Sequence, residues 1–222
     1  MKFKLIAFDL DGTLLDSVPD LALAAQQTVK ELGYPAVTEE QVRDYVGNGA
    51  DILIGRALSQ SIDVNPEIPV QVLQQARHLF DEFYAQSGHR ASHLYPNVAS
   101  TLAALKKSGH TLAIVTNKPS KFVPEILEQH AIGEYFSEVL GGDAFAEKKP
   151  NPVALLHLQE KFAVSAEDML MVGDSKNDIL AARNAGCQVL GLTYGYNHGE
   201  PINDSAPDYV SDDINVLLDI VK

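Results

Sequence analysis

The sequence predicts an α/β fold in which a parallel sheet forms the core and an all-helical cap domain is inserted into that core. The first observation is a short apolar run at residues 4–8, which is typical of a strand buried on both faces. The second is that strand and helix patterns alternate from residue 97 onward, as they do around parallel sheets. The third is that helical patterns, without a convincing strand, fill the segment between residues 14 and 93.

The segment between residues 14 and 93 carries helical patterns at 20–32, from 38 toward 46, at 50–58 and at 69–85. Gly33 ends the first pattern, and Thr38 with Gln41 forms a capping-box signature at the start of the second. Because this is far more helix than one crossover connection needs, it indicates a separate bundle. We therefore expect a helical cap domain at residues 17–93 with hinges at 18–19 and 88–96. The catalytic core would comprise residues 1–16 and 94–222.

The segment after these helices predicts a Rossmann-like parallel sheet. Its apolar runs predict strands at 111–115, 136–140, 169–172, 189–192 and 209–210. Its helical patterns lie at 98–107, 119–130, 153–162, 177–185 and 215–221. Asn97 is the expected N-cap of the first of these helices, and Pro124 can shift the start of the second. Ligands of such sheets bind beyond the carboxyl ends of the strands, so the residues at those positions are the candidates for function.

The composition limits the partners and the compartment. A formal net charge of −13 over 222 residues argues against nucleic-acid backbones and anionic membranes as partners, although it does not exclude a phosphate substrate. Cys187 is the only cysteine and has small and apolar neighbours, so we expect a buried thiol, no disulfide framework and a cytoplasmic location. The apolar run that Asp9 interrupts is too short for a signal peptide or a membrane span. The composition predicts no particular oligomeric state.

Two aspartates stand where the first strand ends. Asp9 and Asp11 are separated by one residue and are followed by Gly12 and Thr13. Residues two apart in a strand face the same way, so both carboxylates can face one pocket. Two like charges that close together need a cation or a shared proton. The alternative is a simple turn with a solvated carboxylate, and the apolar strand in front of the aspartates argues against it.

Two later positions are further candidates, one after a strand and one on a turn. Thr116 and Asn117 end the strand at 111–115, where a hydroxyl and the backbone N–H groups after it can bind a phosphoryl oxygen. Lys149 precedes Pro150 on a turn that prolines stiffen. Each position has a plain structural alternative. The first can be an ordinary helix cap, and the second can be a solvated pair of lysines, Lys148 and Lys149.

Two further aspartates follow the strand at 169–172. Asp174 and Asp178 lie four residues apart where a helix begins, a position at which aspartate is often only a cap. Together with Asp9 and Asp11, however, they bring four carboxylates to the carboxyl edge of one sheet. Hard oxygen ligands that leave room for water and phosphate suit Mg2+. We therefore expect a Mg2+ site at this edge.

In the cap, the Gly47-Asn48-Gly49 break between two helices is a candidate substrate loop. Two glycines around an asparagine would let backbone N–H groups approach a small anionic ligand. Arg43 and Arg56 flank the loop and are candidates for holding a carboxylate. A plain helix–helix turn and two solvated arginines are the alternatives that the sequence leaves open.

Four motifs of the chain resemble those of the haloacid dehalogenase-like superfamily, in its aspartyl-phosphatase branch with a helical cap. They are Phe8-Asp9-Leu10-Asp11-Gly12-Thr13-Leu14, the strand end at Thr116, Lys149-Pro150-Asn151-Pro152 and Gly173-Asp174-Ser175-Lys176-Asn177-Asp178. The likeness covers essentially the whole chain. Residues 46–50 also resemble the corresponding loop of the bacterial phosphoglycolate phosphatases in this superfamily.

The resemblance implies a catalytic role for four residues. Asp9 is implied to be the nucleophile, and Asp11 the general acid and base. Thr116 is implied to bind the phosphoryl group, and Lys149 to neutralise both that group and the nucleophile.

The resemblance also implies how metal and substrate are held. Asp9 and Asp174 would bind Mg2+ through their side chains, Asp11 through its backbone carbonyl, and Asp178 would belong to the surrounding network. The expected substrate contacts are Thr116, Asn117, Gly47, Asn48 and Gly49.

The expected function is hydrolysis of a small phosphomonoester with Mg2+ as cofactor, and 2-phosphoglycolate is the first choice of substrate. Asp11 favours phosphoryl chemistry over carbon–halogen cleavage, because the dehalogenases lack the second aspartate. A phosphosugar mutase of the β-phosphoglucomutase type shares these motifs and is an alternative, as is a phosphatase for another small metabolite. A non-catalytic binding protein on this fold would be expected to lack Asp9, Asp11 or Lys149, and all three are present.

Overall fold

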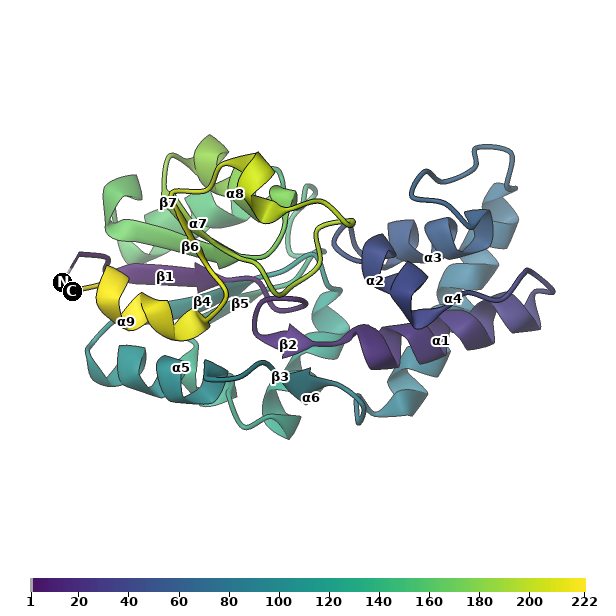
Figure 1. Cartoon of the computed structure of the whole chain (residues 1–222), viewed down its shortest axis with the longest axis horizontal. Helices are drawn as coiled ribbons and strands as arrows, with labels where there is room; N and C mark the ends of the chain where they lie inside the picture. The colour runs from purple at the N-terminus through teal and green to yellow at the C-terminus, as the bar shows by residue number, and fades with distance from the viewer. Residues whose placement is uncertain (1) are drawn as a thin grey trace.

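Six parallel strands form the central sheet of the computed structural model, which describes residues 2–222 (Figure 1). They are β1 (Leu5–Phe8), β4 (Thr111–Val115), β5 (Glu138–Leu140), β6 (Met169–Gly173), β7 (Gln188–Leu192) and β8 (Tyr209–Ser211). Their order in the sheet is β5-β4-β1-β6-β7-β8. The chain therefore adds β4 and β5 on one side of β1, and then adds β6, β7 and β8 on the other side. The crevice where the order reverses, between β1 and β6, is where ligands of such sheets bind.

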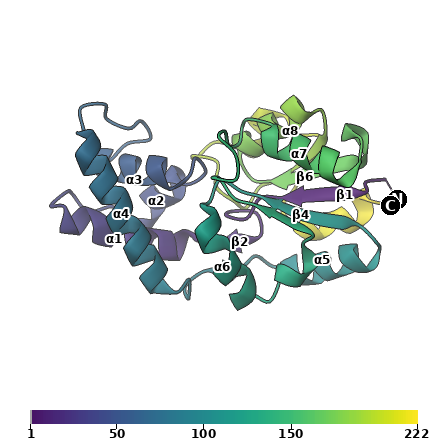
Figure 2. The same cartoon turned by 180° about the vertical axis from the view of Figure 1, so that it is seen from behind.

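Both faces of the sheet are covered by helices, which explains why its strands are uninterrupted apolar runs. Ile6 and Phe8 belong to one hydrophobic core with helix α5 (Val98–Lys107), whereas Leu5 and Ala7 belong to a second core. The second core includes α7 (Val153–Phe162) and α8 (Lys176–Ala185). Figure 2 shows α7 and α8 on one side of the sheet and α5 on the other. The α/β fold with a parallel core sheet is confirmed.

Four helices pack against one another beyond the carboxyl ends of β1 and β4 (Figure 1). They are α1 (Val18–Glu31), α2 (Glu39–Tyr45), α3 (Ala50–Ser59) and α4 (Val70–Ser87). The capping box that was expected at Thr38 and Gln41 forms at the start of α2. A short antiparallel ribbon of β2 (Leu15–Asp16) and β3 (His93–Leu94) joins the helices to the core.

Several boundaries differ from the sequence prediction. Strand β2 was missed, because two residues are too short to show any alternation. Helix α1 begins at Val18 instead of residue 20, since Pro19 fits the first turn of a helix, where a missing N–H costs no hydrogen bond. Strand β5 is shorter than expected, because a turn of 3-10 helix at Gly133–Tyr135 leads into it. Asn97 occupies the N-cap position of α5, but its side chain donates to Asp213 instead of capping the helix.

Two predicted helices, at 119–130 and 215–221, are each divided into a 3-10 turn and a short α-helix. The segment expected as one helix over 119–130 is a 3-10 turn, Ser120–Phe122, followed by α6 (Val123–Gln129), with Pro124 in its first turn. The closing helix is a 3-10 turn, Ile214–Val216, followed by α9 (Leu217–Ile220). Short 3-10 turns also occur at Ala166–Asp168 and Ile202–Ser205. Within residues 2–222, no helix has the length and apolarity that a membrane crossing requires.

Candidate active site

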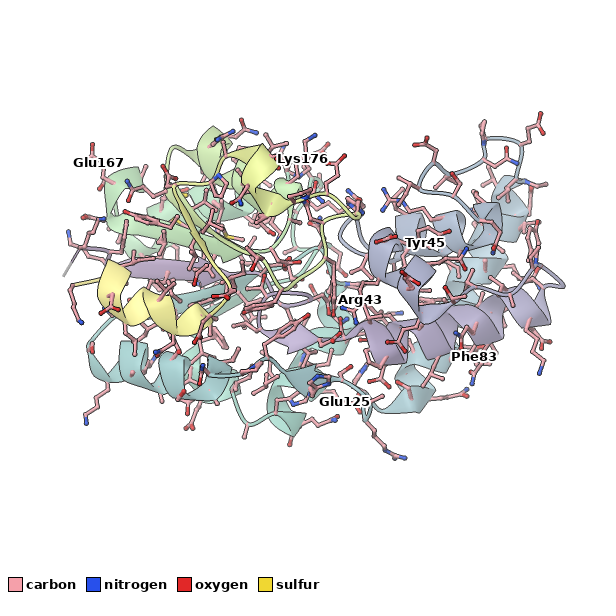
Figure 3. The ribbon with its side chains drawn as sticks, in the orientation of Figure 1. Arg43, Tyr45, Phe83, Glu125, Glu167 and Lys176 are labelled. Atoms are coloured by element: carbon pink, nitrogen blue, oxygen red, sulfur yellow. The ribbon has the colours of Figure 1, made fainter. Side chains whose placement is uncertain are left out.

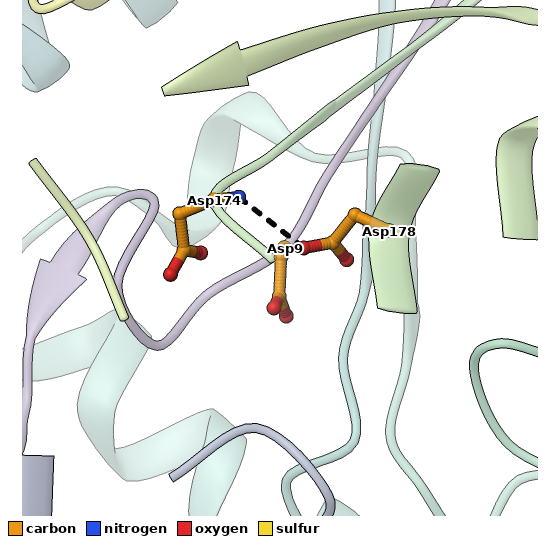
Figure 4. Close-up of side chains that lie close together, drawn as sticks. All are labelled: Asp9, Asp174 and Asp178. Atoms are coloured by element: carbon orange, nitrogen blue, oxygen red, sulfur yellow. Dashed lines mark hydrogen bonds between the residues drawn. The ribbon is translucent and has the colours of Figure 1, made fainter. Parts of the chain in front are cut away.

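Three buried carboxylates meet at the crevice between β1 and β6. Asp9 follows β1, Asp174 follows β6, and Asp178 lies in the first turn of α8. Their side chains contribute oxygen atoms that all lie within 4.8 Å of one another (Figure 4). The sequence placed these residues on separate elements, and the fold brings them together because parallel strands end at the same edge of the sheet.

Asp178 is held by hydrogen bonds from three directions. Its Oδ1 accepts from Lys149 Nζ at 2.6 Å, and its Oδ2 accepts from the backbone N–H groups of Asp174 and Ser175 at 3.2 and 3.0 Å. Ser175 Oγ also donates to Oδ2, at 2.7 Å. The carboxylate thus forms part of a capping box and at the same time fixes the Lys149 ammonium.

Asp174 is oriented by Thr13 and Tyr196. Thr13 Oγ1 donates to its Oδ1 at 2.6 Å, and the Tyr196 backbone N–H donates to its Oδ2 at 2.6 Å. Gly12 has a φ of +86°, and a Cβ atom on it would lie 2.2 Å from Asp174 Oδ2. Both residues after Asp11 therefore position Asp174, because Gly12 leaves space for its carboxylate and Thr13 donates a hydrogen bond to it.

The charges at this site are not balanced by the protein. Lys149 Nζ lies 2.9 Å from Asp9 Oδ1 as well as contacting Asp178, so one ammonium serves two carboxylates. Burial, opposed by Lys149 and reinforced by Asp178, raises the pKa of Asp9 to about 6. Burial and the charges of Asp178 and Asp9 hold the pKa of Asp174 well above its usual range. A divalent cation with oxygen ligands would offset this excess of negative charge.

The carboxylate of Asp11 pairs with a different lysine. Lys118 Nζ donates to Asp11 Oδ1 at 3.0 Å and to Oδ2 at 3.2 Å. The Lys118 side chain is only 3% exposed. Sequence reasoning assigned no role to Lys118, because a lysine just after a strand end is usually solvated. The one feature of the sequence that could have indicated a role is that Lys118 directly follows Thr116 and Asn117.

The remaining sequence candidates of the core lie around the same crevice. Thr116 is buried directly after β4, and its backbone N–H donates to Leu140 O at 3.0 Å. Asn117 lines the cavity, but its side-chain amide nitrogen is already used, because it donates to Gly47 O at 2.9 Å and to Lys149 O at 3.0 Å. Asn117 thereby joins the loop between α2 and α3 to the turn that carries Lys149.

The Gly47-Asn48-Gly49 loop lies directly on the core. Gly47 and Gly49 have φ values of +121° and +86°, which favour glycine. A Cβ atom on Gly49 would lie 2.8 Å from Lys148 Nζ and 3.2 Å from Asn117 O. The side-chain oxygen of Asn48 is buried without a hydrogen-bond partner among the described residues. The loop is thus a close contact between the helical segment and the core.

A cavity lies between the helices and the sheet edge. We call the polar part of its sheet side the core wall, formed by Asp9, Asp11, Thr116, Asn117 and Lys118; Pro119 and Phe122 also line this side. We call its helical side the cap wall, formed by Leu21, Val46, Leu53, Phe80 and Tyr84, together with the glycine loop. The core wall is polar and charged, and the side chains of the cap wall are apolar or aromatic.

Neither Arg43 nor Arg56 lines this cavity. Arg56 donates to the backbone oxygens of Ile62 and Tyr45 at 2.7 and 2.9 Å. Arg43, labelled in Figure 3 where the helices meet the core, pairs with Asp16 at 3.4 Å. Its guanidinium also lies 5.1 Å from the centre of the Tyr196 ring. Both guanidinium groups are thus engaged with other parts of the protein.

Comparison with known proteins places this arrangement among phosphatases. Residues 6–192 match the family model described as haloacid dehalogenase-like hydrolase. A Vibrio cholerae protein named phosphoglycolate phosphatase is 69% identical over 98% of this chain and 96% of its own length. A Mannheimia succiniciproducens protein of the same name is 48% identical over 99% of both chains. The crystal structure of a predicted phosphoglycolate phosphatase from Haemophilus somnus superimposes with a TM-score of 0.94 at 44% identity, covering 100% of this chain and 99% of the other.

Proposed function

Because the chain belongs to the haloacid dehalogenase-like hydrolase family, we propose that it is a phosphatase that hydrolyses 2-phosphoglycolate to glycolate and phosphate. The observation that carries the proposal is that Asp9, Asp11 and Thr116 line one cavity, with Lys149 bonded to Asp9. This is the set of groups that an aspartyl-phosphate mechanism needs. The relatives named phosphoglycolate phosphatase support the choice of substrate.

Mg2+ is the cofactor of this proposal. Asp9 and Asp174 would hold it through their carboxylates and Asp11 through its backbone oxygen, while Asp178 stays with Lys149 and Ser175. The residues fit such an ion, because buried oxygen donors in excess of the nearby ammonium charge are what a hard divalent cation requires. When bound, Mg2+ would neutralise charge on the phosphoryl oxygens and help to align them.

In the first step, an oxygen of the Asp9 carboxylate attacks phosphorus in line and displaces the substrate alkoxide, which leaves an aspartyl-phosphate. Asp11 donates a proton to that alkoxide, so glycolate leaves as the alcohol. Thr116 and the backbone N–H groups after it hold the equatorial oxygens. In the second step, Asp11 takes a proton from a water molecule that attacks phosphorus. This attack breaks the bond to Asp9 and releases phosphate.

The helices would close the site. We assign residues 17–93 to a cap domain and residues 1–16 and 94–222 to the catalytic core. A cap with an apolar wall excludes bulk water and restricts the substrate to a small molecule. The single buried Cys187 is compatible with a reducing compartment, so a cytoplasmic location belongs to the proposal.

The experiment is phosphate release from a panel of small phosphomonoesters and phosphosugars, with and without Mg2+. We expect 2-phosphoglycolate to be hydrolysed fastest and activity to disappear when Mg2+ is chelated. Isomerisation of a phosphosugar without net phosphate release would favour a mutase instead. Full activity in excess chelator would contradict the role of the metal.

A further inference from the structure

We propose that Lys118 and Tyr84 form a subsite that binds the carboxylate of the substrate, so that the protein selects short phosphorylated carboxylic acids. The inference rests on the proposed function, because it explains how a phosphatase would distinguish 2-phosphoglycolate from a phosphate ester of equal size that lacks a carboxylate. Lys118 comes from the core wall and Tyr84 from helix α4 of the cap wall. The subsite therefore spans the two sides of the cavity.

The first argument is the charge of the cavity lining. Among the described residues that line it, Lys118 is the only one with a cationic side chain. Lys149 lies behind Asp9 and is shared with Asp178. Arg43 and Arg56 are bonded elsewhere. A substrate carboxylate buried against the apolar side chains of the cap wall needs a partner charge, and Lys118 is the cationic side chain among the lining residues.

The second argument is the geometry of Lys118. Its backbone is fixed on both sides, because its N–H donates to Thr116 Oγ1 at 3.2 Å and its carbonyl accepts from Gly142 N–H at 2.8 Å. An ammonium group has three N–H donors. The two oxygens of Asp11 use two of them at most, and the ammonium otherwise lies against Tyr84, so the remaining donor can turn to a second carboxylate placed beside Tyr84.

The third argument is an unused hydroxyl group. The Tyr84 side chain is buried and lines the cavity, and its hydroxyl lies close to the Lys118 ammonium, but the hydroxyl proton has no acceptor among residues 2–222. Lys118 Nζ lies 4.6 Å from the centre of the Tyr84 ring, so both groups occupy the same corner. Burial raises the pKa of Tyr84 to about 12, so the hydroxyl keeps its proton and can donate it in a hydrogen bond. A buried donor without an acceptor is unfavourable, and a substrate carboxylate would provide that acceptor.

The fourth argument is the length of the substrate. Lys118 follows Thr116 by two residues and contacts Asp11, which follows Asp9 by two. The phosphate and carboxylate positions are therefore close, and Phe80 and Leu53 line the same cavity. One carbon between the ester oxygen and the carboxylate, as in 2-phosphoglycolate, suits this spacing.

The test compares 2-phosphoglycolate with ethyl phosphate, in which a methyl group replaces the carboxylate. We define the selectivity as the ratio of kcat/KM for these two substrates. Lys118→Met should lower the selectivity on the order of a hundredfold, because an ionic hydrogen bond is lost. Tyr84→Phe should lower it roughly fivefold to tenfold. Glycolate should also inhibit the Lys118→Met variant more weakly than the wild type.

The matched control is Lys121→Met, which removes the same charge three residues away, where the side chain is exposed and pairs with Asp81. Its selectivity should equal that of the wild type. The proposal is overturned if Lys118→Met and Tyr84→Phe keep the wild-type selectivity while the turnover of both substrates falls equally. A residue that only positions Asp11 would behave in that way. If Lys118→Met does not fold, Tyr84→Phe, which removes one oxygen atom, decides alone. A wild type with no preference for 2-phosphoglycolate would instead refute the proposed function itself.

Discussion

The two walls of the cavity are built on different principles. The polar groups of the core wall come from strand ends and from the loops that directly follow them, and backbone hydrogen bonds fix their positions. The cap wall consists mainly of apolar side chains on helices α1, α3 and α4, which are held by packing. The comparison suggests a division of labour. Changes at Asp9, Asp11 or Thr116 of the core wall should slow the reaction of every substrate, whereas changes at Lys118 or in the cap wall should alter which substrate is preferred.

The largest effect is expected for Asp9→Asn. The amide is a poor nucleophile, so kcat should fall by about ten-thousandfold or more with every substrate tested. Steady-state phosphate release measures this loss, and mass spectrometry should find no phosphate on the protein. Unequal losses for esters with and without a carboxylate would contradict this division between the walls, because they would give Asp9 a role in substrate selection.

Asp11→Asn should lower the turnover of 2-phosphoglycolate by roughly a hundredfold to ten-thousandfold, since the leaving alkoxide then lacks its proton donor. An acidic leaving group such as nitrophenol needs less protonation. Rapid mixing with nitrophenyl phosphate should therefore give a burst of nitrophenol and a phosphate label on Asp9, followed by slow hydrolysis. A label on another residue, or the same burst from Asp9→Asn, would show that the roles are assigned wrongly.

A smaller effect, on the order of tenfold, is expected for Gly49→Val. The φ of +86° and the nearby Lys148 and Asn117 leave no room for a side chain, so the loop must move. The kcat/KM for 2-phosphoglycolate should drop more than that for nitrophenyl phosphate, which depends less on a closed cap. Gly47→Val is expected to behave alike. Parallel losses for both substrates would remove the loop from substrate selection.

Arg56→Met should leave the substrate preference unchanged and reduce stability instead. The side chain donates to the carbonyl groups of Tyr45 and Ile62, and these would lose their partners. Urea unfolding should show a loss of about 1–3 kcal/mol. A changed ratio between 2-phosphoglycolate and ethyl phosphate would reveal that Arg56 acts on the substrate after all.

The smallest expected effect is on the pH dependence of the free energy of unfolding, through His89 beside Tyr84. His89 is buried 4.5 Å from the Tyr84 ring, and burial with the nearby Lys118 charge lowers its pKa. The folded state then binds fewer protons than the unfolded chain below the ordinary histidine pKa of about 6.5. The free energy of unfolding should therefore fall as the pH drops below that value. A weaker dependence in His89→Asn, measured by urea unfolding from pH 7 to 5.5, supports this assignment, and an identical slope contradicts it.

The core wall was largely predictable from the sequence, and the reason is geometric. Parallel strands end at one edge, so polar residues after apolar runs, such as Asp9, Thr116 and Asp174, must converge there. The glycine loop was also predictable, because a Gly-Asn-Gly break between two helical patterns marks a special backbone. The two-residue strand Leu15–Asp16 was not, since its pairing with His93–Leu94 joins segments about eighty residues apart.

Lys118 and Tyr84 show what the sequence leaves out. A lysine is normally solvated, but the Lys118 side chain is only 3% exposed and lies against the Tyr84 ring of α4. Tyr84 lies on the buried face of α4 with Ala76 and Phe80, where any large apolar residue would satisfy the pattern. Whether its hydroxyl finds a partner depends on groups from other elements. Pairs of this kind depend on tertiary distance, which periodicity does not encode.

The contact between the glycine loop and the core has a consequence for how new specificities can arise. Gly47 O accepts from the side-chain amides of Asn117 and Asn177, at 2.9 and 3.2 Å. The helical segment thus contributes a main-chain oxygen to this attachment, and every residue type carries the same oxygen. Substitutions at Leu53 or Phe80 can therefore reshape the substrate chamber while this attachment persists. Such modularity lets a lineage, or a protein engineer, exchange one substrate for another without rebuilding the mechanism of closure.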